Sequence, residues 1–189
     1  MPPAFLTGTR VYLRALERVD VPAILPWVND QEVIQHLLIH RPTNLAMEEA
    51  FIDAVARSEH DLVFGMCERR TDRLIGVAGL HRIDDKNRQA MFGIFIGGAG
   101  SRGKGYGSEA TAMVVHYAFN TLNLNRIWLH VFENNKPGIR VYEKVGFRKE
   151  GVLRQDSFRR GRYRDTIVMG ILHPTASRAR RQPGRPRPR

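Results

Sequence analysis

The sequence of 189 residues lacks several features that define other classes of protein. Cys67 is its only cysteine, so the chain can form neither an internal disulfide nor a metal site built from several thiolates. No apolar run approaches the ~18 residues of a membrane-spanning helix, and no charged segment leads into an apolar one at the N-terminus. We therefore expect a cytoplasmic protein with no membrane partner.

Histidines with metal-ligand spacing are also scarce. Among the seven histidines only His36 and His40 stand at i and i+4, and no third ligand lies near them. We predict no metal site. The hydrophobic content of 42% in a chain of this length fits one domain with a single core.

The net charge of +11 is unevenly distributed. Six arginines lie in residues 178–189, which leaves 24 basic and 19 acidic groups, a net of +5, in residues 1–177. We predict one domain over residues 1–173 and a disordered, Arg/Pro-rich tail over residues 174–189. Such a tail suits weak contact with RNA or the ribosome through phosphates, although a solvated tail with no partner fits the same composition.

Short apolar segments alternate with segments of helical periodicity, which predicts an α/β (α+β) fold with a mixed sheet. Strands are expected at Val11–Ala15, Leu62–Glu68, Leu74–His81, Ala90–Ile96, Arg126–Phe132, Phe147–Arg154 and Tyr163–Leu172. Asp20 is expected to cap a helix that runs to Val28, and further helices are expected at Met47–Arg57 and Ala110–Leu122.

Six glycines lie from Gly97 to Gly107, after an apolar run that ends at Ile96 and before a helical segment. This layout is typical of a strand, a tight turn and the start of a helix. Glycine lets the backbone approach a ligand closely, and the unpaired amides that open a helix attract anions. The segment therefore predicts a binding site for the phosphate groups of a cofactor.

Three phosphate-binding patterns overlap in this loop. Gly98–Lys104 fits the start of a nucleotide P-loop, but Gly105 follows where a Ser or Thr hydroxyl should hold magnesium. Gly98, Gly100 and Gly103 spell the dinucleotide fingerprint, yet Glu133 lies farther on than the ~20 residues expected for the ribose-binding acid. The third pattern is an R-x-x-G-x-G sequence, Arg102-Gly103-Lys104-Gly105-Tyr106-Gly107.

A second motif supports the third pattern. It follows the apolar run Arg126–Phe132 and reads Asn135-Lys136-Pro137-Gly138-Ile139-Arg140-Val141-Tyr142-Glu143-Lys144-Val145-Gly146-Phe147. With both motifs in this order, the sequence resembles the GNAT N-acetyltransferase superfamily. The segments Leu25–Val33, Glu150–Arg154 and Gly161–Asp165 are similar to its RimJ/RimL branch, the ribosomal-protein-alanine N-acetyltransferases, and the likeness covers about residues 8–173.

The resemblance implies a GNAT-like fold, with a central, mixed, mostly antiparallel and twisted sheet of about six to seven strands flanked by helices. It implies acetyl-coenzyme A as the cofactor and transfer of its acetyl group to a primary amine. The residues that it assigns to the cofactor are Ile94, Phe95, Ile96, Arg102, Gly103, Lys104, Gly105, Tyr106, Gly107, Asn135 and Tyr142.

The resemblance also suggests which residues move protons. Tyr142 stands where many members carry a general acid that protonates the departing thiolate. A phenol near pKa ~10 transfers its proton to a thiolate near ~8.5 only about 2 kcal/mol uphill, and the alternative role for the tyrosine is packing. Glu150 is the first candidate for the general base that deprotonates the amine, and Glu133 is the second.

For the acceptor, the RimJ/RimL likeness implies a protein N-terminus and leaves a homodimer open. The expected acceptor wall from Asp156 to Tyr163 is basic, with Arg159, Arg160, Arg162 and Arg164 against Asp156 and Asp165. A polyamine would prefer a more acidic wall. A polyamine, an aminoglycoside or another small amine stays open, as does a non-catalytic module that senses acyl-coenzyme A or binds RNA.

Overall fold

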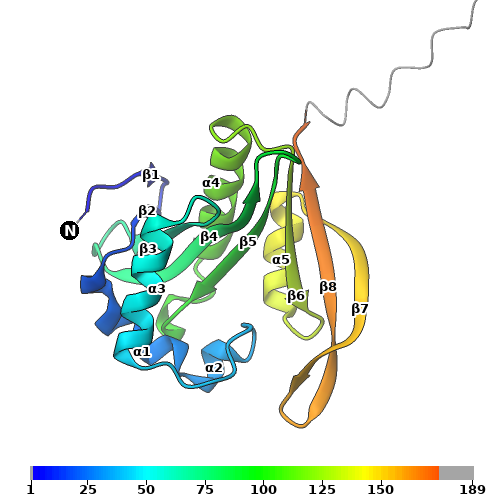
Figure 1. Ribbon diagram of the computed structural model, residues 1–189, viewed down its shortest axis with the longest axis horizontal. Helices are drawn as coiled ribbons and strands as arrows, with labels where there is room; N and C mark the ends of the chain where they lie inside the picture. The colour runs from blue at the N-terminus through cyan, green and yellow to red at the C-terminus, as the bar shows by residue number, and fades with distance from the viewer. Residues whose placement is uncertain (1, 175–189) are drawn as a thin grey trace, which may run out of the picture.

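The structure is a computed structural model that describes residues 2–174, so the predicted basic tail lies outside the described residues except for Pro174. Eight strands form one sheet in the order β1-β2-β3-β4-β5-β6-β8-β7 (Figure 1). The strands are β1 (Leu6–Thr7), β2 (Val11–Ala15), β3 (Leu62–Glu68), β4 (Leu74–Asp84), β5 (Gln89–Ile96), β6 (Arg126–Phe132), β7 (Arg148–Arg159) and β8 (Arg162–Leu172).

Helices cover both faces of the sheet. They are α1 (Val21–Val28), α2 (Gln31–Ile34), α3 (Leu45–Arg57), α4 (Tyr106–Asn120) and α5 (Lys136–Val145), with short 3-10 turns at Arg18–Asp20 and Ala99–Ser101. Within residues 2–174 no helix is both long and apolar enough to cross a membrane.

The predicted fold class is confirmed, with one correction to the strand count. All neighbouring strands are antiparallel except β5 and β6, which are parallel. The sheet has eight strands instead of six to seven. The extra strand is β1, in which Leu6 pairs with Leu13 and Thr7 with Tyr12. A strand of two residues is too short to leave an alternating pattern in the sequence.

The larger part of the core lies between the sheet and helices α4 and α5. The apolar stripe predicted for α4 is confirmed, because Ala110, Val114 and Ala118 are each 0% exposed against the strands. A second, smaller cluster lies on the opposite face, where Ile24 of α1 and Ile52 of α3 pack with Val77 of β4. The sheet is thus the middle of three layers, and its two faces are available to different parts of a site.

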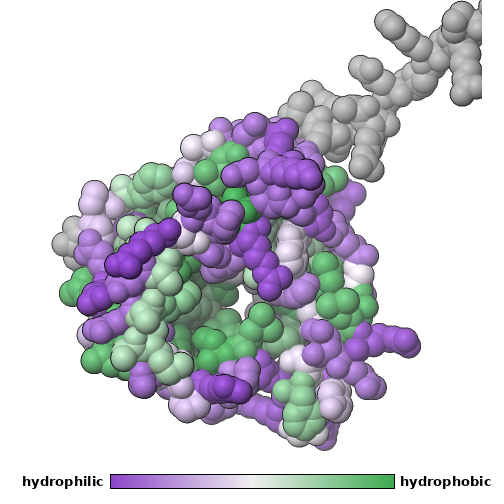
Figure 2. Space-filling model, viewed as in Figure 1, coloured by the Kyte–Doolittle hydropathy of each residue, from purple (hydrophilic) through white to green (hydrophobic). Residues whose placement is uncertain are grey.

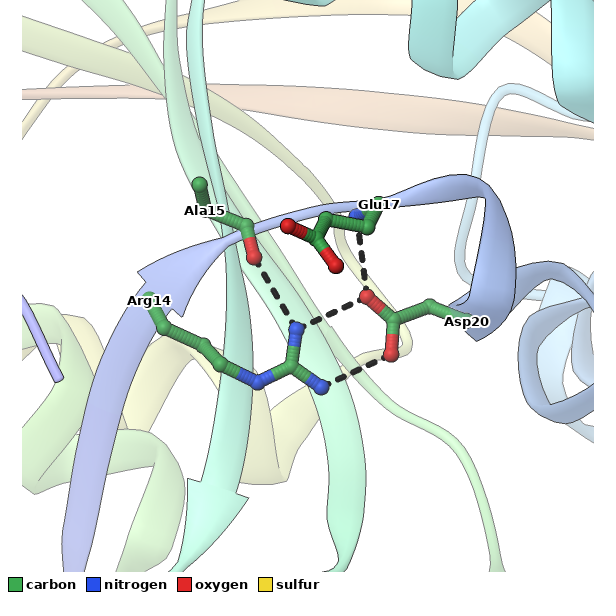
Figure 3. A network of polar contacts seen from close by, with 4 residues as sticks. All are labelled: Arg14, Ala15, Glu17 and Asp20. Carbon is green, nitrogen blue, oxygen red and sulfur yellow. Dashed lines mark hydrogen bonds and ion pairs between the residues drawn. The ribbon is translucent and has the colours of Figure 1, made fainter. Parts of the chain in front are cut away.

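A buried ion pair fixes the start of α1 to the sheet (Figure 3). Arg14 donates two hydrogen bonds to the Asp20 carboxylate, at 2.7 and 2.8 Å, and Asp20 also accepts from the Glu17 amide at 3.0 Å. Burial by itself would raise the pKa of Asp20, but the hydrogen bonds from Arg14 and Glu17 outweigh it and lower that pKa. The sequence predicts that Asp20 caps α1, and this prediction is wrong. The Asp20 side chain makes no cap hydrogen bond and instead binds Arg14.

Candidate active site

Strands β5 and β6 lie side by side at their beginnings and then separate (Figure 1). They pair only over Gln89–Met91 and Arg126–Trp128. Beyond these residues β5 continues to pair with β4, and β6 continues to pair with β8. The facing backbone edges are therefore left open within the described residues, and Figure 2 shows the surface hollowed over this gap.

The glycine loop, residues 97–105, lies at the diverging end of β5 and leads into α4 (Figure 1). Gly103 and Gly105 have φ angles of 76° and 82°, a left-handed backbone that favours glycine. A Cβ atom added at Gly98, Gly100 or Gly103 would meet no atom within 4 Å, so the loop is open to a ligand. No side chain caps the first amides of α4, which are free to bind an anion.

Positive charge gathers beside the glycine loop. The Arg10 guanidinium donates to the Lys104 carbonyl at 3.0 Å, and the Arg102 guanidinium donates back to the Gly97 carbonyl at 3.1 Å. A surface pocket of about 400 Å³ adjoins the loop; its lining includes Arg10, Arg69, Arg70 and Lys104. Basic groups around a loop of free amides suit a phosphate-bearing ligand.

The side chains of several predicted cofactor residues contact other parts of the protein. The Tyr106 hydroxyl donates to the Glu68 carboxylate, and Tyr106 is only 8% exposed, so its amide is the group left for a ligand. Phe95 packs edge-on against Trp27 of α1, with ring centroids 6.4 Å apart. Ile94 and Ile96 pack against the core on the opposite face of the sheet, and Ile96 also lies under Gly107.

Tyr142 of α5 lies where the two strands begin to separate. Its ring packs against Phe92, the first residue of β5 beyond the paired segment, and against Phe147, with centroids 6.3 and 5.9 Å away. Burial raises the pKa of Tyr142 to about 12. Its hydroxyl makes no hydrogen bond within residues 2–174 and is protonated at neutral pH, so it can donate to a ligand.

Asn135 fixes the start of α5. Its side-chain oxygen accepts from the Gly138 amide at 3.0 Å, as expected of an N-cap. The structure thus gives Asn135 the helix-capping role, and its contact with the cofactor stays a prediction.

The two candidate bases lie in different surroundings. Glu150 forms an ion pair with Arg126 at the start of β6 and lies over Gly170 of β8. Glu133 directly follows β6 at the diverging end, with its carboxylate 4.0 Å from the Arg164 guanidinium and its side chain 43% exposed. The structure therefore places Glu133, not Glu150, at the end of β6 where the gap opens.

A second cavity, of about 180 Å³, lies beside Glu133 and is called here the hairpin pocket. It is bounded by the segment around α2, by Asn134 and by the tip of the β7–β8 hairpin. Its lining residues are Gln31, Ile34, Gln35, Ile39, His40, Asn134, Phe158, Arg159, Arg160 and Arg164. The predicted acceptor wall from Asp156 to Tyr163 thus borders a cavity.

His36, which the sequence marks only by its spacing to His40, also belongs to this region. Burial lowers the pKa of His36, and the positive charges of Arg102 and Arg160 lower it further. Its Nδ1 atom is buried with no hydrogen-bond partner in the described part of the chain. The neutral imidazole therefore lies within reach of the charges of both the glycine loop and the hairpin, a position that only tertiary structure creates.

The residues present fit acetyl-coenzyme A. The open glycines and helix amides suit its phosphates, and the gap between β5 and β6 offers unpaired backbone groups to the extended arm that carries the thioester. By contrast, no group of three or more His, Cys, Asp or Glu side chains within residues 2–174 could hold a metal ion.

Comparison with known proteins agrees with this geometry. The family described as acetyltransferase (GNAT) domain matches residues 10–148. A probable N-acetyltransferase of Bacillus subtilis strain 168, YjcK, is 41% identical over 177 residues, covering 89% of this chain and 97% of its own. The spermidine N(1)-acetyltransferase of Escherichia coli K12 is 31% identical and covers 86% of each chain. The crystal structure of spermidine N-acetyltransferase from Vibrio cholerae in complex with CoA and spermine superposes with a TM-score of 0.81 at 30% identity, covering 87% of this chain and 96% of that one.

Proposed function

The chain belongs to the GNAT acetyltransferase family, and from that membership we propose that this acetyl-coenzyme A-dependent N-acetyltransferase acts on the primary amine of a small molecule. The single observation that supports the activity best is the gap between β5 and β6 with the glycine loop at its open end. Family membership shows the N-acetyltransferase activity, whereas the acceptor class is a proposal.

A small amine is better supported than the protein N-terminus expected from the RimJ/RimL likeness. The relatives whose names state a substrate are spermidine acetyltransferases. The hairpin pocket, at about 180 Å³, is also smaller than the ~300–1,000 Å³ of usual ligand sites. A protein N-terminus, contact with RNA and a homodimer find no support in the relatives. A polyamine is the second candidate, favoured by the names of those relatives.

The donor is held by the glycine loop in this proposal. The backbone amides of Gly103, Gly105 and Tyr106 bind the phosphates, with Lys104 and Arg10 beside them. Acetyl-coenzyme A supplies the acetyl group as a thioester, and the free amides at the end of β5 polarise its carbonyl oxygen.

Two groups then handle the protons. Tyr142 donates its phenolic proton to the sulfur that leaves. With its pKa raised to about 12, full transfer to a thiolate near ~8.5 is about 5 kcal/mol uphill, so the hydroxyl first stabilises the leaving sulfur by a hydrogen bond. Glu133, rather than Glu150, accepts the amine's proton, directly or through water, because it lies beside the hairpin pocket. Glu133→Gln should therefore lower kcat, whereas Glu150→Gln should leave kcat nearly unchanged.

The site assignment can be tested with two substitutions at one residue. Asn and Asp both tolerate the left-handed backbone of Gly103, and space at this position is open, so Gly103→Asn and Gly103→Asp should fold alike. The Asp variant adds a negative charge where the phosphates bind. Calorimetric titration should show acetyl-coenzyme A binding at least about tenfold weaker to Gly103→Asp than to Gly103→Asn, with a difference that shrinks in high salt. Equal affinities would contradict the assignment of the phosphate site to this loop.

A further inference from the structure

Resting on the proposed function above, we infer that the acceptor amine carries a negatively charged group, a carboxylate or a phosphate, which the arginines of the hairpin pocket bind. The acceptor would then differ in charge from the polyamines named for the relatives. Four features of the pocket support this inference: its position, its lining, the compensation of its charges and its rigidity.

The hairpin pocket adjoins the reaction gap. Asn134, one of its lining residues, directly precedes the N-cap of α5 and follows Glu133. The helix that begins there carries Tyr142, whose ring marks the point where β5 and β6 separate. A molecule in the pocket therefore lies beside the C-terminal end of β6, next to the candidate base.

The lining of the pocket is basic. Arg159, Arg160, Arg164 and His40 contribute to it, whereas no Asp or Glu does. Guanidinium groups bind carboxylates and phosphates through two parallel hydrogen bonds, which makes arginine the usual residue for these anions. A polycation in the same cavity would be repelled by like charges and would lack a carboxylate partner.

Carboxylates outside the pocket compensate only part of this charge. Arg160 pairs with Glu32 at 2.9 Å, but Arg164 lies 4.0 Å from Glu133, at the limit of an ion pair. Arg159 has no carboxylate partner in the described part of the chain. Its Nη2 donates to the Leu37 carbonyl at 2.8 Å, and its Nε is buried without a partner. Positive charge is thus left over for a bound anion.

Arg159 and the hairpin turn are also held in place before any ligand binds. The Arg159 guanidinium lies over the Phe132 ring, 5.7 Å from its centroid, and its bond to Leu37 ties the hairpin to the segment after α2. Arg160 and Gly161 form the hairpin turn with φ angles of 50° and 75°, the geometry of a tight two-residue loop. A site with prearranged donors loses less entropy on binding, which favours a functional role for this charge.

Matched pairs of acceptors test the inference on the wild-type enzyme. Release of the coenzyme A thiol is followed with γ-aminobutyrate against propylamine and with phosphoethanolamine against ethanolamine, where each pair differs by one anionic group. Spermidine and a short peptide with a free N-terminus complete the set. We expect kcat/KM about tenfold or more higher for at least one anionic member than for its neutral partner, and the pair that shows it tells carboxylate from phosphate.

A variant then assigns the preference to the pocket. Arg164→Gln should lower the anionic-to-neutral ratio about tenfold, whereas Arg148→Gln, at the exposed opposite end of β7, should leave it unchanged. Higher kcat/KM for spermidine, for the neutral amines or for the peptide would overturn the inference. If no amine is turned over although acetyl-coenzyme A binds, the proposed function itself fails.

Discussion

The Tyr142→Phe substitution separates catalysis from packing more cleanly than other changes in this site. The ring contacts with Phe92 and Phe147 survive the exchange, because only the hydroxyl is removed. That hydroxyl has no hydrogen-bond partner within residues 2–174, so no buried group is left unpaired by its loss. The variant should therefore be about as stable as the wild type.

The effect on turnover should be large. Loss of a general acid typically lowers the rate by about 10²–10⁴-fold, and we expect kcat to fall by at least about 10²-fold. The dissociation constant for acetyl-coenzyme A should stay the same, because the proposed site for the phosphates is the glycine loop and does not include the Tyr142 hydroxyl. Steady-state thiol release measures kcat, calorimetry measures binding, and thermal unfolding checks the fold.

A matched control is available in Tyr117 of α4, whose ring packs against Phe5 and Phe64 away from the gap. Tyr117→Phe should leave kcat unchanged. If Tyr142→Phe also keeps its kcat, the acid is another group and Tyr142 is a packing residue. A fall in both melting temperature and kcat would point to damaged packing instead of a lost proton donor.

Two further predictions concern stability. Asp20→Asn should lower the free energy of unfolding by about 3–5 kcal/mol in urea titrations, because it leaves the Arg14 charge buried and unpaired. Asp53→Asn, which breaks the exposed pair with Arg18, should change the free energy of unfolding little. Similar losses in the two variants would contradict the importance of burial. Raising the pH from 10 to 12 should destabilise the wild type by about 2 kcal/mol more than Tyr142→Phe, because burial raises the pKa of Tyr142 from 10.0 to about 12 and the unfolded tyrosine loses its proton first. The contribution of Tyr142 to stability is fully present below pH 10. Parallel curves of unfolding free energy against pH for the two proteins would refute the raised pKa of Tyr142.

The central strands are predictable from sequence because they are buried along their length. β3 and β6 begin and end at the predicted residues, Leu62–Glu68 and Arg126–Phe132, where apolar side chains dominate. The same holds for the glycine loop, since Gly103 and Gly105 adopt backbone angles that favour glycine over other residues. Local chemistry specifies these parts of the fold.

Strand β7 of the outer hairpin is less predictable because it is mostly exposed. β7 extends to Arg159, five residues past its predicted end, through a polar segment with no apolar alternation. The hairpin pocket depends on a bond from Arg159 to Leu37, which are 122 residues apart. A sequence shows that the hairpin is basic, but it does not show which carboxylates lie near each arginine. For the same reason, the residues that surround His36 cannot be predicted from the sequence.

The position of β8 has a consequence for how the protein is made. β8 is the last strand in the chain, yet it lies between β6 and β7 and pairs with both. During translation β6 and β7 therefore have no common partner until residues up to Leu172 have left the ribosome. The half of the sheet that packs against α4 is built from earlier segments, whereas the β7–β8 hairpin with its arginines cannot form before the last strand is made. A nascent chain would thus acquire its cofactor loop before its acceptor wall.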